Sequence, residues 1–223
     1  NAVGMGIMSE AVRIDVLTPP GAPTGAGVDV EGSNYLHMAW SAPTEDGGSP
    51  VESYRVYQGP SATGAFELAG TTPVQSTTII NLMNGMTYYF KVSAVNAAGE
   101  GPLSSVFSGM PRGAAYAPQN LTAQADAAGV TLSWEPPISY GGGYFGTTHI
   151  YRGTAPGGET FLDYVTYDKF SFLDADVDPG LAYYYKVAVS NEYGLGEFSD
   201  QAWAIAADVP DAPSWLIGHS GNG

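Results

Sequence analysis

Cysteine is absent from this chain of 223 residues, and basic side chains are scarce, with 7 Lys and Arg against 22 Asp and Glu. The lack of cysteine excludes disulfide bonds, thiol nucleophiles and cysteine-ligated metal sites, but it does not indicate a compartment. The formal net charge of −15 disfavours binding to nucleic acid or to an anionic membrane surface. Cations and basic protein surfaces are better matched as partners.

Long apolar runs and catalytic motifs are also missing from the sequence. No run of 18 apolar residues is present, so we expect no membrane insertion. The three histidines, His37, His149 and His219, stand about one domain apart from each other, whereas acid–base or metal chemistry needs converging side chains. No nucleophile elbow, phosphate-binding glycine loop or zinc motif occurs. The sequence therefore predicts a protein that is not an enzyme and has no cofactor.

The most informative feature is segment 81–101, which recurs 95 positions later. The same residue types recur at Gly85 and Gly180, Tyr88 and Tyr183, Lys91 and Lys186, Val92 and Val187, and Asn96 and Asn191. A period of 95 residues is typical of a small domain. We therefore predict complete domains at 19–113 and 114–209, the last strand of a preceding domain at 1–18, and the start of a following one at 210–223. The chain would then be a fragment of a longer array.

Short strand candidates, separated by turn residues, fill each repeat. In the first repeat they lie at 35–40, 51–58, 77–82 and 88–95, and no helical pattern of convincing length occurs. Asp46-Gly47-Gly48 and Asn84-Gly85 supply turns between them. This pattern predicts an all-β fold with two consecutive antiparallel β-sandwiches.

These residues closely resemble the fibronectin type III family over nearly the whole chain. The first copy carries Pro23, Trp40-x-x-Pro43, Tyr54-x-Val56-Tyr57, Leu82-x-x-Gly85-x-x-Tyr88-x-Phe90-x-Val92 and Asn96. The second copy matches at Pro118, Leu121, Trp134, Pro137, Tyr151, Gly180, Tyr183, Tyr185, Val187, Asn191 and Gly194, and departs where Thr148 replaces a tyrosine. The resemblance implies immunoglobulin-like sandwiches in which Trp40 and Trp134 fill the core. It also implies that Tyr88 and Tyr183 form tyrosine corners.

Aromatic side chains in the second repeat are the candidate interaction residues. Tyr140, Tyr144 and Phe145 surround a glycine-rich loop, and the resemblance places the last hairpin, with Tyr193, at the same end of the sandwich. Trp203 should face outward on the final strand, near the next domain. These residues predict a protein or glycan site, with domain packing as the alternative.

An acidic cluster, Asp174, Asp176 and Asp178, has the alternating carboxylates of a calcium loop. The twelfth position, where such a loop needs a bidentate glutamate, holds Tyr185. The family resemblance assigns this segment to the turn before the tyrosine corner. We therefore favour a structural turn and keep calcium as the weaker hypothesis.

Together these features predict a non-catalytic spacer and protein-interaction scaffold in an extracellular, cell-surface or virion tail-fibre protein. An adhesin or glycan-binding module that uses the loop aromatics is one alternative. Accessory domains of a secreted polysaccharide-active enzyme are another. Neighbouring domains of the same chain are the expected partners, and the strand expected within 1–18 has an edge that could pair with another chain.

Overall fold

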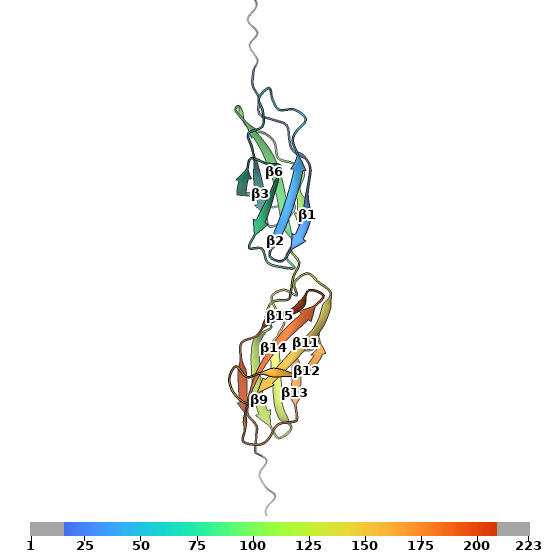
Figure 1. The fold of residues 1–223 in the computed structure, drawn as a ribbon, viewed down its shortest axis with the longest axis vertical. Helices are drawn as coiled ribbons and strands as arrows, with labels where there is room; N and C mark the ends of the chain where they lie inside the picture. Colours follow the sequence, from blue (N-terminus) through green and yellow to red (C-terminus); the bar gives the residue numbers. More distant parts are fainter. Residues whose placement is uncertain (1–15, 209–223) are drawn as a thin grey trace, which may run out of the picture. The chain divides into compact units, whose positions relative to one another are not determined.

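The computed structural model describes residues 16–208. Within that range the regular secondary structure consists of β-strands (Figure 1). The chain divides into two compact units, the first containing residues 35–80 and 87–109 and the second residues 110–208. The strand expected within 1–18 and the domain start expected at 210–223 lie outside the described residues, apart from residues 16–18. Within the described range, no helix is long and apolar enough to cross a membrane.

The first unit is built from two antiparallel sheets. One sheet has the order β1-β2-β5, and the other has the order β4-β3-β6-β7, with β8 also paired to β6. The strands are β1 (Thr24–Gly32), β2 (Tyr35–Ser41), β3 (Ser53–Gly59), β4 (Glu67–Thr72), β5 (Ser76–Ile80), β6 (Tyr88–Asn96), β7 (Gly99–Glu100) and β8 (Phe107–Gly109).

The second unit repeats this topology. Its sheets have the orders β13-β10-β9 and β12-β11-β14-β15, with β16 paired to β14. The strands are β9 (Gln119–Asp126), β10 (Gly129–Glu135), β11 (Phe145–Gly153), β12 (Thr160–Thr166), β13 (Ser171–Asp174), β14 (Ala182–Asn191), β15 (Gly194–Phe198) and β16 (Ala202–Ile205).

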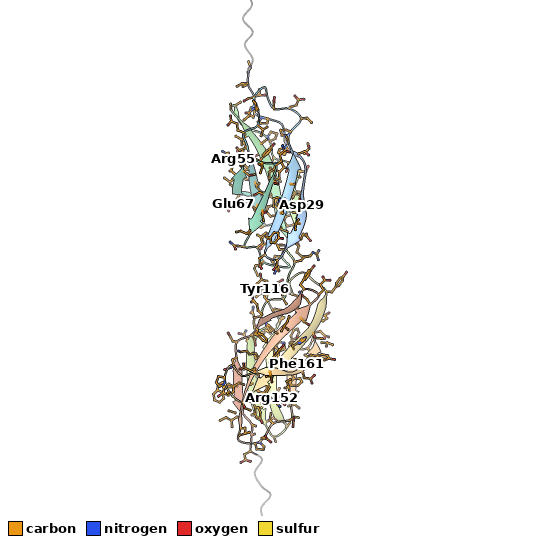
Figure 2. All side chains as sticks on the ribbon, in the orientation of Figure 1. Asp29, Arg55, Glu67, Tyr116, Arg152 and Phe161 are labelled. Carbon is orange, nitrogen blue, oxygen red and sulfur yellow. The ribbon has the colours of Figure 1, made fainter. Side chains whose placement is uncertain are left out.

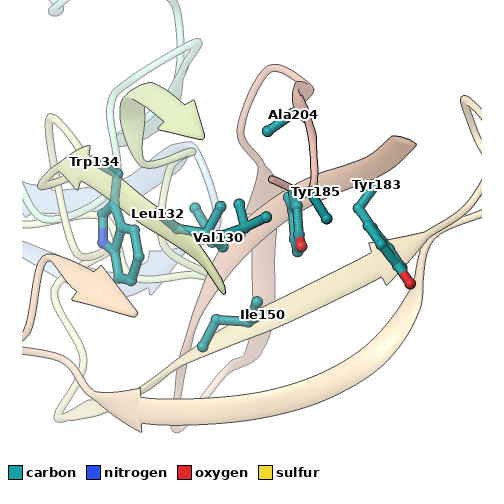
Figure 3. Packing of buried hydrophobic residues seen from close by; sticks show 9 residues of the cluster. Val130, Leu132, Trp134, Ile150, Tyr183, Tyr185 and Ala204 are labelled. Carbon is teal, nitrogen blue, oxygen red and sulfur yellow. The ribbon is translucent and has the colours of Figure 1, made fainter. Parts of the chain in front are cut away.

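Alternating apolar residues form a separate core in each unit. In β2, Leu36, Met38 and Trp40 are buried while their neighbours are exposed or half-buried, because successive strand residues point to opposite faces. In the second unit, Trp134 packs with a cluster drawn from both sheets (Figure 3). The remaining buried members of that cluster are Val130, Leu132, Ile150, Tyr183, Tyr185, Val187, Ala204 and Ala206.

The predicted tyrosine corner is present in the second unit. The backbone N–H of Asp178 donates a hydrogen bond of 2.9 Å to the hydroxyl oxygen of Tyr183, whose side chain is buried. A glycine stands three residues before each of the recurring tyrosines, Tyr88 and Tyr183. Gly85 and Gly180 both have φ of 78°, a backbone conformation that favours glycine. The recurring glycine therefore has a geometric cause in both units, and the tyrosine has one in the second unit.

The recurring asparagines hold each unit's incoming segment in place. The Asn96 amide donates to the carbonyl oxygens of Thr18 at 2.8 Å and Asp46 at 2.7 Å. The Asn191 amide donates in the same way to Gly113 at 2.8 Å and Tyr140 at 2.9 Å. Each asparagine thus joins the segment that leads into its unit to a loop of the same unit.

Candidate interaction surface

The predicted loop aromatics lie around the glycine-rich turn of the second unit, with unequal exposure. Tyr144 is 82% exposed and Tyr193 is 47% exposed. The Tyr193 ring lies so close to Gly143 that a Cβ atom there would be 3.0 Å from it, so the two loops do meet. Tyr140 is half-buried and its ring packs edge-on against another tyrosine. The backbone of Phe145 pairs with Asn191 in the sheet, and its side chain lies outside what the structure describes.

The acidic cluster does not gather its carboxylates around one point. Both carboxylate oxygens of Asp174, which is 3% exposed, accept hydrogen bonds of 2.9 Å from Arg152 Nη1, and the Tyr185 hydroxyl donates to Oδ2 at 2.9 Å. Asp176 offers its backbone oxygen to Arg152, and Asp178 offers its N–H to the tyrosine corner. No group of three or more potential metal-ligating side chains occurs among residues 16–208. The carboxylate of Asp174 serves an internal ion pair.

Burial and the Asp174 carboxylate shift the ionisation of Tyr185. Desolvation is the largest cause that raises the pKa of its hydroxyl, and the hydrogen bond to Asp174 adds to it. Tyr185 is 0% exposed. This hydroxyl therefore stays protonated as a donor to a buried, paired carboxylate.

A set of aromatic side chains, which the loop prediction did not include, covers one side of the larger sheet in the second unit. We define the aromatic face as His149 and Tyr151 of β11, Phe161 and Tyr164 of β12, and Phe198 of β15; Figure 2 labels Phe161. Phe161, Tyr164 and Phe198 are 52%, 60% and 46% exposed. On the opposite side of the sheet, Ile150 and Val187 are fully buried in the core. The aromatic face therefore looks away from the core.

The rings of the aromatic face touch each other across three strands. Tyr151 lies with its centroid 4.9 Å from that of Phe198 and 5.8 Å from that of Phe161. His149 is 5.6 Å from Phe161 and 6.4 Å from Tyr164. The interplanar angles of 80° and 83° at Tyr151 are edge-to-face geometries, which aromatic pairs prefer. The result is one connected cluster of aromatic rings.

A β-bulge puts two of these rings on the same side of the sheet. Residues three apart in a regular strand point to opposite faces. In β12, however, Tyr151 pairs with Phe161 and Ile150 pairs with Asp163, so Leu162 is an extra residue. Phe161 and Tyr164 consequently both join the aromatic face, while Leu162 packs against the core.

The aromatic face belongs to a domain with a net negative charge. Lys186 of β14 pairs with Tyr151 in the sheet, next to the aromatic face. Its ammonium group lies 3.4 Å from the Glu159 carboxylate, so its charge is compensated. Hydrogen bonds and this cation hold the pKa of Glu159 below its ordinary value, although burial alone would raise it. Between residues 114 and 208 the sequence has 12 Asp and Glu side chains against three Lys and Arg, a difference of −9. A depression of about 200 Å³, lined by Tyr151, Gly157, Glu159, Lys186 and Phe198, opens beside the rings.

Trp203 lies on β16 opposite Tyr184, with their ring centroids 6.4 Å apart. It is 58% exposed, so the predicted outward orientation is confirmed. Its contact with a neighbouring domain stays a prediction.

Comparison with known proteins agrees with this fold. Residues 21–110 match the sequence profile of the fibronectin type III domain. The crystal structure of the chicken CNTN1 FN1–FN3 domains aligns with 85% of this chain and 67% of its own, with a TM-score of 0.61 and 25% sequence identity. The chain belongs to the fibronectin type III family.

Several curated relatives share the fibronectin type III region. Contactin-1a of Danio rerio is 30% identical over 225 residues, which cover 91% of this chain and 21% of that protein. Receptor-type tyrosine-protein phosphatase F of Rattus norvegicus is 28% identical over 227 residues, which cover 96% of this chain and 11% of that protein. This chain therefore spans about a fifth or less of their length. The phosphatase matches through its fibronectin type III region and not through its catalytic domain.

The two fibronectin type III domains carry different residues on the same face. In the first domain, Tyr57 pairs with Leu68 where the second has Tyr151 with Phe161. The other equivalent positions follow from the same strand pairings: Arg55 and His149, Thr71 and Tyr164, Ser93 and Ala188, Glu100 and Leu195, and Ser108 and Trp203. Charged and small polar side chains in the first domain are thus replaced by aromatic and apolar ones in the second.

A polar network occupies this face in the first fibronectin type III domain. Glu100 forms an ion pair with Arg55 and accepts hydrogen bonds from Tyr57 at 2.5 Å and Ser93 at 2.6 Å. Burial would raise the pKa of Glu100, but these three donors hold it below its ordinary value. Leu195, which is 41% exposed, takes the place of that acceptor in the second domain. The sequence did contain a signal for the aromatic face, namely the residues that differ between the two copies. Those residues can be recognised as one surface only when the strand pairing is known.

Proposed function

We propose that this chain is a non-catalytic spacer and protein-interaction scaffold in a larger protein of the cell surface or extracellular space, with domains at 19–113 and 114–209. The observation that carries the proposal is the similarity over 91% and 96% of the chain to contactin-1a and to a receptor-type phosphatase. The virion and secreted-enzyme settings gain no support from these relatives.

We further propose that the aromatic face is the part of the scaffold that docks a partner protein. Exposed aromatic side chains in contact with each other are typical of binding hot spots, because each buries a large apolar area at low entropic cost. The acidic surroundings select a partner that carries Arg or Lys side chains, which also bind the faces of aromatic rings. A glycan fits this surface less well, since rings set at 80° and 83° do not form one flat platform for sugars.

Binding to cells tests this proposal. Beads coated with the chain are added to a panel of cell lines, before and after protease treatment of the cells. The variant Phe161→Leu/Tyr164→Thr installs the first domain's residues, and Leu68→Ala/Thr71→Ala is the matched control. We expect protease-sensitive binding that weakens with added salt and falls at least about tenfold in the first variant only, because two hot-spot contacts of more than about 1 kcal/mol are lost.

The opposite results are equally clear. Binding that survives protease and disappears with Tyr144→Ala would favour the glycan-binding adhesin. Two results would contradict the docking surface. One is an equal loss of binding in Phe161→Leu/Tyr164→Thr and in the control Leu68→Ala/Thr71→Ala, and the other is no binding to any cell line.

A further inference from the structure

The second domain contains a triplet that fits the acceptor for N-linked glycosylation. Asn120-Leu121-Thr122 is the one Asn-x-Ser/Thr triplet in the sequence, and its middle residue is not proline. Asn120 lies at the start of β9 and is exposed to solvent. Its side chain is therefore accessible to a large modification.

The backbone explains the asparagine but not the threonine. Asn120 has φ of 53°, and Gly25, 95 residues earlier in the first domain, has φ of 62°. Asparagine is one of the residues other than glycine that adopt this left-handed conformation most readily. The fold does not require a threonine two residues later, since the first domain has Gly27 there, with open space around it. The Thr122 hydroxyl donates a hydrogen bond of 3.3 Å to the backbone oxygen of Ser133 on β10, and Thr122 also completes the acceptor triplet.

The side chain of Asn120 is placed so that it can carry a sugar. Nδ2 donates a hydrogen bond of 2.8 Å to Glu135 Oε2. An amide nitrogen has two hydrogens, so the bond to Glu135 can remain after one hydrogen is replaced.

A shallow groove of about 370 Å³ lies beside Asn120. Exposed apolar side chains and two carboxylates line it, among them Ile138, Phe198, Glu197 and Asp200. Ile138 is 58% exposed, an apolar surface that the first sugar rings would cover. The carboxylates can accept hydrogen bonds from sugar hydroxyls.

We propose that Asn120 is N-glycosylated when the chain enters the secretory pathway, an inference that rests on the extracellular setting proposed above. The co-substrate is a lipid pyrophosphate-linked oligosaccharide, used by a membrane-bound oligosaccharide transferase. Asn120 Nδ2 forms a bond to C1 of the first sugar while the bond from C1 to the pyrophosphate oxygen breaks. The lipid pyrophosphate leaves with that electron pair, and the amide proton passes to a base of the transferase.

Expression in animal cells tests the modification. The full chain is fused to a cleavable secretion leader, and lysate and medium are analysed together by peptide-N-glycosidase digestion and mass spectrometry. We expect a mass decrease on digestion, with Asn120 converted to Asp. Asn120→Gly keeps the backbone conformation and Thr122→Ala leaves the asparagine in place, and both should abolish the decrease. Thr122→Ser should retain it.

The first domain offers a gain-of-site control. The double substitution Gly25→Asn/Gly27→Thr transfers the acceptor triplet to the equivalent position, and it should add a second glycan. An unmodified wild-type chain, or a decrease that persists in Asn120→Gly, would overturn the inference. Because the leader delivers the chain to the transferase whatever it binds, this result is independent of the bead assay.

Discussion

One partly buried group of side chains distinguishes the second domain from the first. Arg152, Asp174 and Tyr185 form a charged and hydrogen-bonded cluster at the core, whereas the pair equivalent to Arg152 and Tyr185 in the first domain is Gln58 and Phe90. Asp174, Asp176 and Asp178 suggested a calcium site because carboxylates occupy alternate positions there. Its buried carboxylate has an internal cation instead, supplied by a strand of the other sheet, which no local pattern reveals. A buried ion pair of this kind makes the domain sensitive to the loss of either partner.

Removing the Tyr185 hydroxyl should reveal its contribution and its pH dependence. Tyr185→Phe should lower the free energy of unfolding of the second domain by about 1.5–3 kcal/mol at neutral pH, because a hydrogen bond to a charged group is lost. The raised pKa of Tyr185 means that this contribution is complete below the unfolded-state pKa near 10.0 and declines as the pH rises above it. The gap between wild type and variant should therefore narrow in urea titrations at alkaline pH. A gap that stays constant would contradict the assignment.

The strands show how far the sequence leads and where it stops. Strict alternation and the 95-residue repeat were enough to predict the strands at 35–40 and 88–95, which the structure confirms as β2 and β6. The aromatic face was not predicted, because its members lie on three different strands and a β-bulge changes which side two of them face. Phe161 and Tyr164 share a side only because Leu162 is an extra residue in β12. The alternation of residues within one strand does not indicate which strands pair or in which register.

The aromatic face should contribute little to stability. Phe161→Leu and Tyr164→Thr should each change the free energy of unfolding by about 1 kcal/mol or less, since these side chains are 52% and 60% exposed and cross-strand pairs contribute little. Ile150→Ala, on the opposite side of β11, should cost about 2–5 kcal/mol because it opens a cavity. Urea unfolding compares the three variants. Face variants as costly as Ile150→Ala would assign the rings a structural role.

At the scale of the whole chain, two separate cores are combined with a net charge of −15. Each fibronectin type III domain has its own buried tryptophan, Trp40 or Trp134, and each is 5% exposed. Domains with independent cores can change their surfaces independently, which is what the two versions of the same face show. The fold follows from residues that both copies share, and the proposed function follows from residues in which they differ.

Truncating one tryptophan should weaken one domain only. Trp134→Ala should lower the free energy of unfolding of the second domain by about 3–5 kcal/mol and leave the first unchanged, because the cores are separate. Trp40→Ala should do the reverse. Hydrogen exchange followed by mass spectrometry assigns each loss to its domain. Loss of protection in both domains from one substitution would indicate a shared core.

The asparagine amides have a mechanical consequence. Asn96 and Asn191 tie the segment that leads into each domain, at Thr18 or Gly113, to the end of β6 or β14. Both strands have partners on either side within their sheets. A pulling force applied at the N-terminal side of a domain would load this amide before it loaded β1 or β9. It would also load the backbone hydrogen bonds that join the same segment to the neighbouring loop, from Thr18 N–H to Gly47 O and from Gly113 N–H to Gly141 O. Resistance to force would then begin at these two joints, where one side-chain amide and the backbone hydrogen bonds share the load.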